Sequence, residues 1–189
     1  MTPALISAFL TYTLITALTP GPNNILALSS VTAHGLRRSL RVLAGMSIGF
    51  IITMLICAAL TFSLVELDSR FTRILGWIGA AYILWLAWQI AKSKPGAGAL
   101  STEPVGFWAS LGLQFVNVKI ILYGITALST FVLPVTREPI WLISVSLLLA
   151  AIGALGNLCW ALAGHLFQRL FLLYGRQPVS YTHLTLPTT

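Results

Sequence analysis

Long apolar stretches, separated by short segments that carry most of the charges, are the main pattern along this chain. Apart from Arg73 near one end and Lys119, none of these stretches contains an Asp, Glu, Lys or Arg residue. A helix needs roughly 20 apolar residues to cross the hydrocarbon core of a bilayer, so each stretch is long enough to span it. The pattern predicts an all-α protein, a polytopic bundle of transmembrane helices, with spans at about 4–31, 42–64, 71–91, 107–133 and 139–163.

The composition agrees with lipid as the main solvent of the protein surface. Apolar residues make up 57% of the 189 positions and charged residues only 8%, and the mean hydropathy is +0.90. Soluble domains usually carry about 25% charged residues. The net charge of +7 does not indicate a nucleic-acid partner, because the basic residues are scattered over short loops rather than gathered in one patch.

The positions of the basic residues predict how the chain is oriented. Cytoplasmic loops of membrane proteins collect Lys and Arg. On one side the predicted loops 34–41 and 92–106 and the segment after the last span carry seven basic residues, while the alternate loops carry three. We therefore expect a cytoplasmic 34–41 loop and an N-terminus outside the cell.

The chain divides into two predicted halves. Residues 1–92 hold three spans, residues 93–106 form a cytoplasmic linker rich in Gly, Pro and Ser, and residues 107–177 hold two spans. Residues 178–189 change character abruptly, since they are rich in Thr and Pro and too short to cross a membrane. We expect this tail to be disordered or foreign to the rest of the chain.

The first span is interrupted near its middle by the run Thr19-Pro20-Gly21-Pro22-Asn23-Asn24. Each proline removes a backbone donor and clashes with the preceding turn, so a continuous helix is not expected. Pro22 suits the first position of a new half-helix, whose free amides and positive dipole end attract an anion such as a carboxylate. The alternative is a kink that only shapes packing. The candidate substrate-binding residues here are Pro20, Gly21, Pro22, Asn23 and Asn24, with the amides of Asn23, Asn24 and Ile25 facing the break.

The fourth span contains three further polar candidates, Gln114, Asn117 and Lys119, again near mid-membrane. An ammonium group at that depth costs about 2.5–3.5 kcal/mol even on the lenient insertion scale. No span contains an acidic partner, so Lys119 needs a backbone carbonyl, an Asn or Gln side chain, or a substrate carboxylate. Lys119 is also a candidate for carrying a coupled proton. The alternative is a lysine that only ties two helices together.

The two interrupted spans are each the first of their half, and they cross the membrane in opposite directions. This layout is typical of an inverted repeat of three plus three helices, with a substrate site at the bilayer midplane between discontinuous helices. Asn157, Trp160 and Tyr123 are further candidates for lining such a cavity.

Cysteines and small residues give weaker signals. Cys57 and Cys159 stand alone inside predicted helices, without a CxxC pair, and no metal-ligand spacing is present. We predict no metal, no cofactor and no enzymatic activity. The pair Gly45 and Gly49 allows close helix contact; internal packing is favoured over dimerisation, and a homodimer stays open as an alternative.

At Thr19-Pro20-Gly21-Pro22-Asn23 and at Gln114-Phe115-Val116-Asn117-Val118-Lys119 the sequence resembles the LysE/RhtB superfamily of amino-acid exporters. Gly35, the Arg37/Arg38 pair and Ala44-Gly45 fit the same pattern. Family members usually have Asn-Pro-Lys where this chain has Asn117-Val118-Lys119, so a break in the fourth span is less strongly expected than one in the first.

The resemblance covers residues 1–177 and implies a six-helix protein of the bacterial inner membrane, so the sixth helix is expected to be missing. Segments around Phe107, Tyr123 and Trp160 are most similar to the branch that exports cysteine and O-acetylserine, which implies these substrates and a proton gradient as the driving force. Two other functions are weighed against export. One is a non-transporting membrane partner protein, and the other is a thiol-redox membrane conductor that would use Cys57 and Cys159.

Overall fold

The computed structural model describes residues 2–66 and 105–174, together with five isolated helical positions, Trp77, Ala81, Leu84, Trp88 and Lys92. Within this part of the chain every regular element is a helix, which confirms the predicted all-α class. Most of the predicted third span (71–91), most of the linker (93–106) and the tail (178–189) lie outside the described residues.

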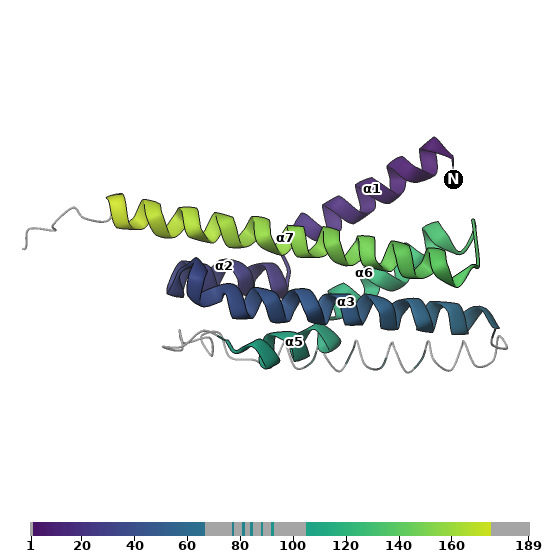
Figure 1. Cartoon of the computed structure of the whole chain (residues 1–189), viewed down its shortest axis with the longest axis horizontal. Coiled ribbons are helices and arrows are strands. Elements are labelled where there is room, and N and C mark those ends of the chain that lie inside the picture. The colour runs from purple at the N-terminus through teal and green to yellow at the C-terminus, as the bar shows by residue number, and fades with distance from the viewer. Residues whose placement is uncertain are drawn as a thin grey trace, which may run out of the picture.

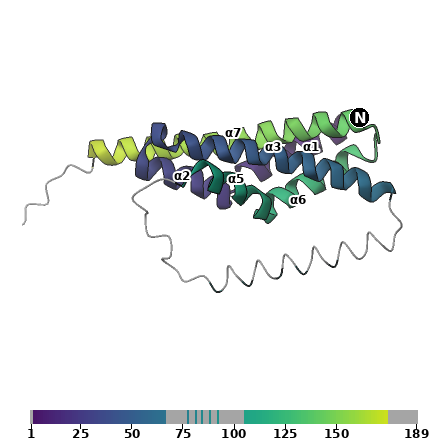
Figure 2. The ribbon, with the colours of Figure 1, turned by 60° about the horizontal axis from the view of Figure 1, so that its bottom comes forward.

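Two long helices form the centre of the bundle, and shorter helices pack against them (Figure 1). The elements are α1 (Pro3–Leu18), α2 (Pro22–His34), α3 (Leu36–Glu66), α5 (Phe107–Val116), α6 (Val118–Ala127), the π-helical turn η1 (Leu128–Val132) and α7 (Pro139–Tyr174). Helix α1 diverges from the bundle toward its N-terminus (Figure 1), and the view in Figure 2 shows α5 and α6 following one another along one side of α3.

The described helices match four of the predicted spans. Leu36–Ser63 of α3 and Pro139–Leu170 of α7 are each long and apolar enough to cross a membrane alone. The other two spans are broken pairs: α1 and α2 meet at a bend of 45°, and α5 meets the α6–η1 segment at 57°. The break in the first span is therefore confirmed, and the less expected break in the fourth span is also present.

The predicted 34–41 loop is wrong, because α3 already begins at Leu36 and carries Arg37, Arg38 and Arg41 within its helix. Gly35 alone connects α2 to α3, with a φ of +80° that favours glycine over any other residue. The last span is also longer than predicted, since α7 continues to Tyr174. Charged residues do not end these helices; they mark where the helices leave the predicted hydrocarbon region.

Gly45 and Gly49 allow α3 to pack closely against α5. A β-carbon on Gly45 would lie 2.3 Å from the carbonyl oxygen of Phe107, and one on Gly49 would lie 2.7 Å from that of Leu111. The internal packing interpretation of this motif is therefore confirmed. Because α5 occupies this face, the motif is not available to a second copy of the chain, and the homodimer stays a prediction without support from it.

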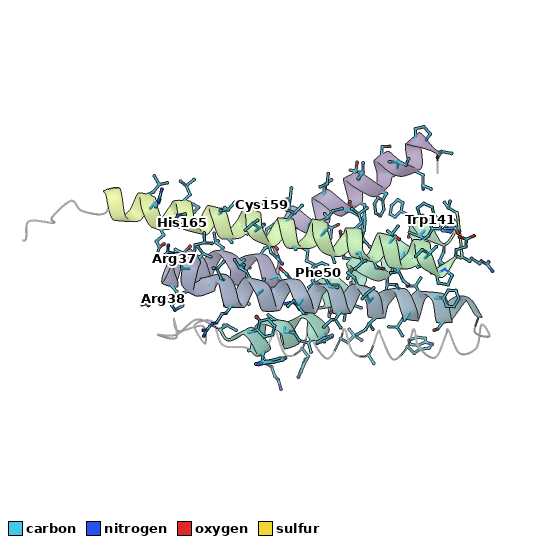
Figure 3. The ribbon with its side chains drawn as sticks, viewed as in Figure 1. Arg37, Arg38, Phe50, Trp141, Cys159 and His165 are labelled. Carbon is cyan, nitrogen blue, oxygen red and sulfur yellow. The ribbon has the colours of Figure 1, made fainter. Side chains whose placement is uncertain are left out.

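The two broken pairs run in opposite directions along the bundle (Figure 1). Arg37, Arg38 and His165 lie toward one end, and Trp141 lies at the opposite end (Figure 3). The two breaks are in contact with each other, as the sequence pattern predicts, because Asn117 and Lys119 at the second break bind Asn23 and Thr19 at the first.

Candidate functional site

The first break is an extended segment whose two ends are joined by Asn24. Thr19 and Gly21 have extended backbone conformations, and Pro22 is the first residue of α2. The side-chain amide of Asn24 donates to the carbonyl oxygens of Ala17 (3.1 Å) and Thr19 (2.8 Å). These contacts satisfy carbonyls that the interrupted helix leaves without an intrahelical donor.

The amides at the start of α2 are only partly available. The prediction for Ile25 is wrong, because its N–H donates to the carbonyl of Gly21 at 2.9 Å. The backbone N–H groups of Asn23 and Asn24 have no hydrogen-bond partner among the described residues. The positive end of the α2 dipole and these two donors therefore remain directed at the break.

The C-terminal carbonyls of α1 receive donors from three other helices. Besides Asn24 on α2, the indole Nε1 of Trp160 on α7 donates to Leu18 at 3.1 Å. The ammonium of Lys119 on α6 donates to the carbonyl of Thr19. A cation is stabilised at this negative end of a helix dipole. The expected partner of Lys119 is thus a backbone carbonyl at the first break.

The second break occurs at Asn117, which has φ −80° and ψ 94° between α5 and α6. No proline is present there. The Asn117 side chain instead donates from Nδ2 to Oδ1 of Asn23 across the bundle, at 3.1 Å. A side-chain hydrogen bond to the other half of the molecule accompanies this departure from helical geometry.

Gln114, which is fully buried, links this contact to the backbone of α5. Its Nε2 donates to the carbonyl of Ser110 at 2.8 Å, and its Oε1 accepts from Nδ2 of Asn23 at 2.5 Å. Its Nε2 also lies 3.3 Å from Oδ1 of Asn23. Asn23, Gln114 and Asn117 thus form one chain of buried amides, which we call the amide chain.

The direction of the amide chain is fixed from one end. A carbonyl oxygen only accepts, so Ser110 requires the NH₂ group of Gln114 to face it, which leaves Oε1 for Asn23. Asn23 then presents Oδ1 to the NH₂ group of Asn117. The last oxygen, Oδ1 of Asn117, is buried and has no partner. Its acceptor role is determined by hydrogen bonds that begin at the backbone.

A cavity of about 30 Å³ lies between the two breaks. On this measure a single water needs roughly 10–15 Å³, so the cavity has room for about two. No Asp or Glu is present among the described residues that line it, and Lys119 is the cation there. The lining residues are Thr16, Ala17, Gly21, Asn23, Asn24, Phe50, Asn117, Lys119, Ile120, Tyr123, Gly153 and Asn157.

Seven of the predicted site residues line this cavity, and four do not. Pro20 and Pro22 are exposed and shape the first break. Gln114 lies behind Asn23 and holds it, and Trp160 binds the end of α1. The lining residues are Gly21, Asn23, Asn24, Asn117, Lys119, Tyr123 and Asn157. The hydroxyl of Tyr123 donates to Leu149 at 3.4 Å.

Sequence reasoning missed Phe50 and Gly153 among others. A β-carbon on Gly153 would lie 2.4 Å from the Phe50 ring, so the glycine makes room for this aromatic side chain between α3 and α7 (Figure 3). The spacing of Gly153 and Asn157 by four residues was the available signal, since such residues share one helix face. Thr16, Ala17 and Ile120 carried no distinguishing signal.

The two cysteines lie on different helices in different surroundings. Cys57 on α3 is buried, Cys159 on α7 is exposed, and both are free thiols. Neither lines the cavity. The described residues contain no cluster of three or more His, Cys, Asp or Glu side chains suited to a metal ion.

The fold and the site together define a multi-pass helical membrane protein with a cavity between two broken helices, lined by apolar side chains together with four asparagines and Lys119. Residues 14–182 match the LysE type translocator family. This chain therefore belongs to the LysE type translocators.

Several curated relatives of this chain carry the same name, cysteine/O-acetylserine efflux protein. One from Klebsiella pneumoniae is 94% identical over 177 residues, which cover 94% of this chain and 90% of the relative. One from Salmonella paratyphi A is 68% identical with 94% and 91% coverage. One from Escherichia coli O1:K1 is 67% identical with the same coverage. No solved structure matches the chain.

Proposed function

We propose that this protein exports cysteine and O-acetylserine as a secondary transporter of the bacterial inner membrane. The names of relatives at 94% and 68% identity support these substrates, and support transport rather than catalysis. One observation on the site carries the proposal. Lys119, the unpaired backbone N–H groups of Asn23 and Asn24, and the unpaired Oδ1 of Asn117 all lie around one cavity.

These groups complement both ends of an amino-acid zwitterion. The substrate carboxylate binds the N–H groups of Asn23 and Asn24 and the ammonium of Lys119, all of which donate. The substrate ammonium donates to Oδ1 of Asn117, which can only accept. Binding a zwitterion would thus satisfy a buried acceptor that has no protein partner.

Substrate entry changes the contacts at the end of α1. The cavity of about 30 Å³ holds roughly two waters and must widen to take an amino acid. An arriving carboxylate competes with the carbonyl of Thr19 for Lys119, the contact that joins α6 to the end of α1. Loss of this contact releases α1 and lets the two halves move for alternating access. Export driven by the proton gradient requires protons to move inward as substrate moves outward, so the proton is carried on the return of the empty site and not with the bound substrate.

The proposed orientation has the N-terminus outside the cell. Arg37 and Arg38 lie toward the end of the bundle at which α2 finishes, opposite the end that carries Trp141 (Figure 3). The bias of Lys and Arg toward cytoplasmic segments assigns that end to the cytoplasm. A single cysteine at Thr2 in a variant without Cys57 and Cys159 should react with an impermeant maleimide in intact cells, and one at Arg38 should not.

Counterflow of labelled cysteine in proteoliposomes tests the function. Wild-type protein should exchange cysteine and O-acetylserine, and an imposed pH gradient should drive accumulation. Lys119→Met should lower the exchange rate by at least about tenfold, because hydrogen bonds to charged groups are worth roughly 1.5–3 kcal/mol. Lys92→Met, at a lysine that packs over Trp88 and does not line the cavity, is the matched control. Wild-type vesicles without exchange would disprove the proposal.

A further inference from the structure

Asn157 is a buried amide without a hydrogen bond. Its side chain is 4% exposed and lines the cavity, and its Nδ2 has no partner. The described residues give its Oδ1 no hydrogen bond either. Buried polar groups are almost always hydrogen-bonded, so an amide that lacks both bonds calls for a ligand or water in the cavity.

Asn157 lines the cavity from α7, a different helix from those that carry the amide chain. On the same face of α7, Gly153 packs on Phe50 and Trp160 binds the end of α1. These residues follow one another at helical spacing, so they form one wall. The second wall carries Asn23, Asn24, Asn117 and Lys119, which come from α2 and from the α5–α6 break.

The side-chain amides of the two walls differ in whether hydrogen bonds hold them in one orientation. Asn117 and Asn23 are held in one orientation by hydrogen bonds that begin at the Ser110 carbonyl. Nothing holds the Asn157 amide, so rotation about its last bond can present either NH₂ or oxygen to the cavity. A fixed donor or acceptor suits a group that every substrate has, and a rotatable amide suits a group that varies.

We propose that Asn157 contacts the side-chain group of the substrate and determines which side chains are exported. This inference rests on the proposed function, in which the fixed wall takes the carboxylate and ammonium common to all amino acids. The Asn157 oxygen accepts from the thiol of cysteine, and its NH₂ group donates to the acetyl carbonyl of O-acetylserine. One residue thereby serves two substrates of different chemistry.

Matched substrate pairs test this assignment in the counterflow assay. O-ethylserine replaces the carbonyl of O-acetylserine by a methylene, and 2-aminobutyrate replaces the thiol of cysteine by a methyl group. Wild-type protein should prefer O-acetylserine to O-ethylserine by roughly twofold to tenfold, the range of a neutral hydrogen bond. The preference for cysteine should be smaller, because a thiol is a weak donor. The nearly isosteric Asn157→Leu should bring both ratios to about one.

A control and a second variant make each outcome decisive. Ser146→Ala removes another buried, unpaired polar group of α7 that does not line the cavity, and it should leave both ratios unchanged. Asn157→Ala replaces the leucine variant if that one does not fold. Should the Asn157 variants slow all four compounds equally, the amide only orders water and the inference is wrong, while the proposed function stands. Absence of exchange by the wild type would instead remove the proposed function and this inference together.

Discussion

The two breaks face the same cavity but are made in different ways. The first contains Pro20 and Pro22, which cannot take part in a continuous helix. The second has no proline, and the chain leaves helical geometry at Asn117 alone. The break without proline is nevertheless the sharper one, with a bend of 57° against 45°.

The difference lies in what maintains each bend. At the first break, covalent geometry excludes the continuous helix whatever the rest of the protein does. At the second, Asn117 donates its NH₂ group to Asn23, and Gln114 joins the same chain. We infer that the second break depends on the first, since its hydrogen-bond partner is a residue of α2.

Replacing Asn23 should have the largest effect on stability and transport, because Asn23 joins the two breaks. Asn23→Leu leaves Oε1 of Gln114 and Nδ2 of Asn117 buried without partners, at about 1–3 kcal/mol for each. The free energy of unfolding should fall by a few kcal/mol and cysteine counterflow by at least about tenfold. A pair of spin labels across the second break should report a straighter segment, with the first break unchanged.

The matched control is Ser30→Ala on the same helix. Ser30 is buried and its hydroxyl donates to Ser39 at 2.9 Å, away from the cavity. This variant should lose about 1 kcal/mol of stability and keep its transport rate. If Asn23→Leu leaves the second bend intact, that break does not depend on the amide chain.

Much of the site could be predicted because its chemistry is local in the sequence. Two prolines define the first break by themselves, and an isolated Lys119 in an apolar stretch requires a polar partner. The second break is less evident from the sequence, because it contains no proline and the hydrogen bond that accompanies it goes to a residue 94 positions away. The role of Gln114 is equally non-local, since nothing in its neighbourhood shows that it orients Asn23.

The 34–41 segment illustrates a different limit. Charge marked it correctly as the place where the chain leaves the apolar pattern, but charge does not end a helix. Gly35 alone makes the turn, and helix α3 runs without interruption from Leu36 through three arginines into the span. Sequence patterns of hydropathy therefore located the membrane region better than they located the ends of the helices.

Gly21→Ala tests the contact between the two breaks with a smaller change. A β-carbon at Gly21 would lie 2.7 Å from Cδ and 3.0 Å from Nζ of Lys119, so the lysine must move away from the Thr19 carbonyl. Because the atoms in the way are the far end of a flexible side chain, the free energy of unfolding should change little. Counterflow should fall by about fivefold to tenfold, since the hydrogen bond of a charged group is displaced. Gly112→Ala, where a β-carbon meets nothing within 4 Å, should leave the rate unchanged. Equal rates for both variants would show that the position of Lys119 is not critical.

Val118→Pro should have the smallest effect, although it adds a proline to the membrane. Val118 is the first residue of α6, where a missing N–H removes no intrahelical bond, and the extended backbone of Asn117 suits a residue before proline. Counterflow should stay within about twofold, and stability should rise by up to about 1 kcal/mol because the unfolded chain loses freedom. Val116→Pro, two residues earlier inside α5, should instead lose about 3 kcal/mol. A transport loss in Val118→Pro as large as that in Asn23→Leu would mean that the second break must stay able to straighten during transport, and that a hydrogen-bonded break is not equivalent to a covalent one.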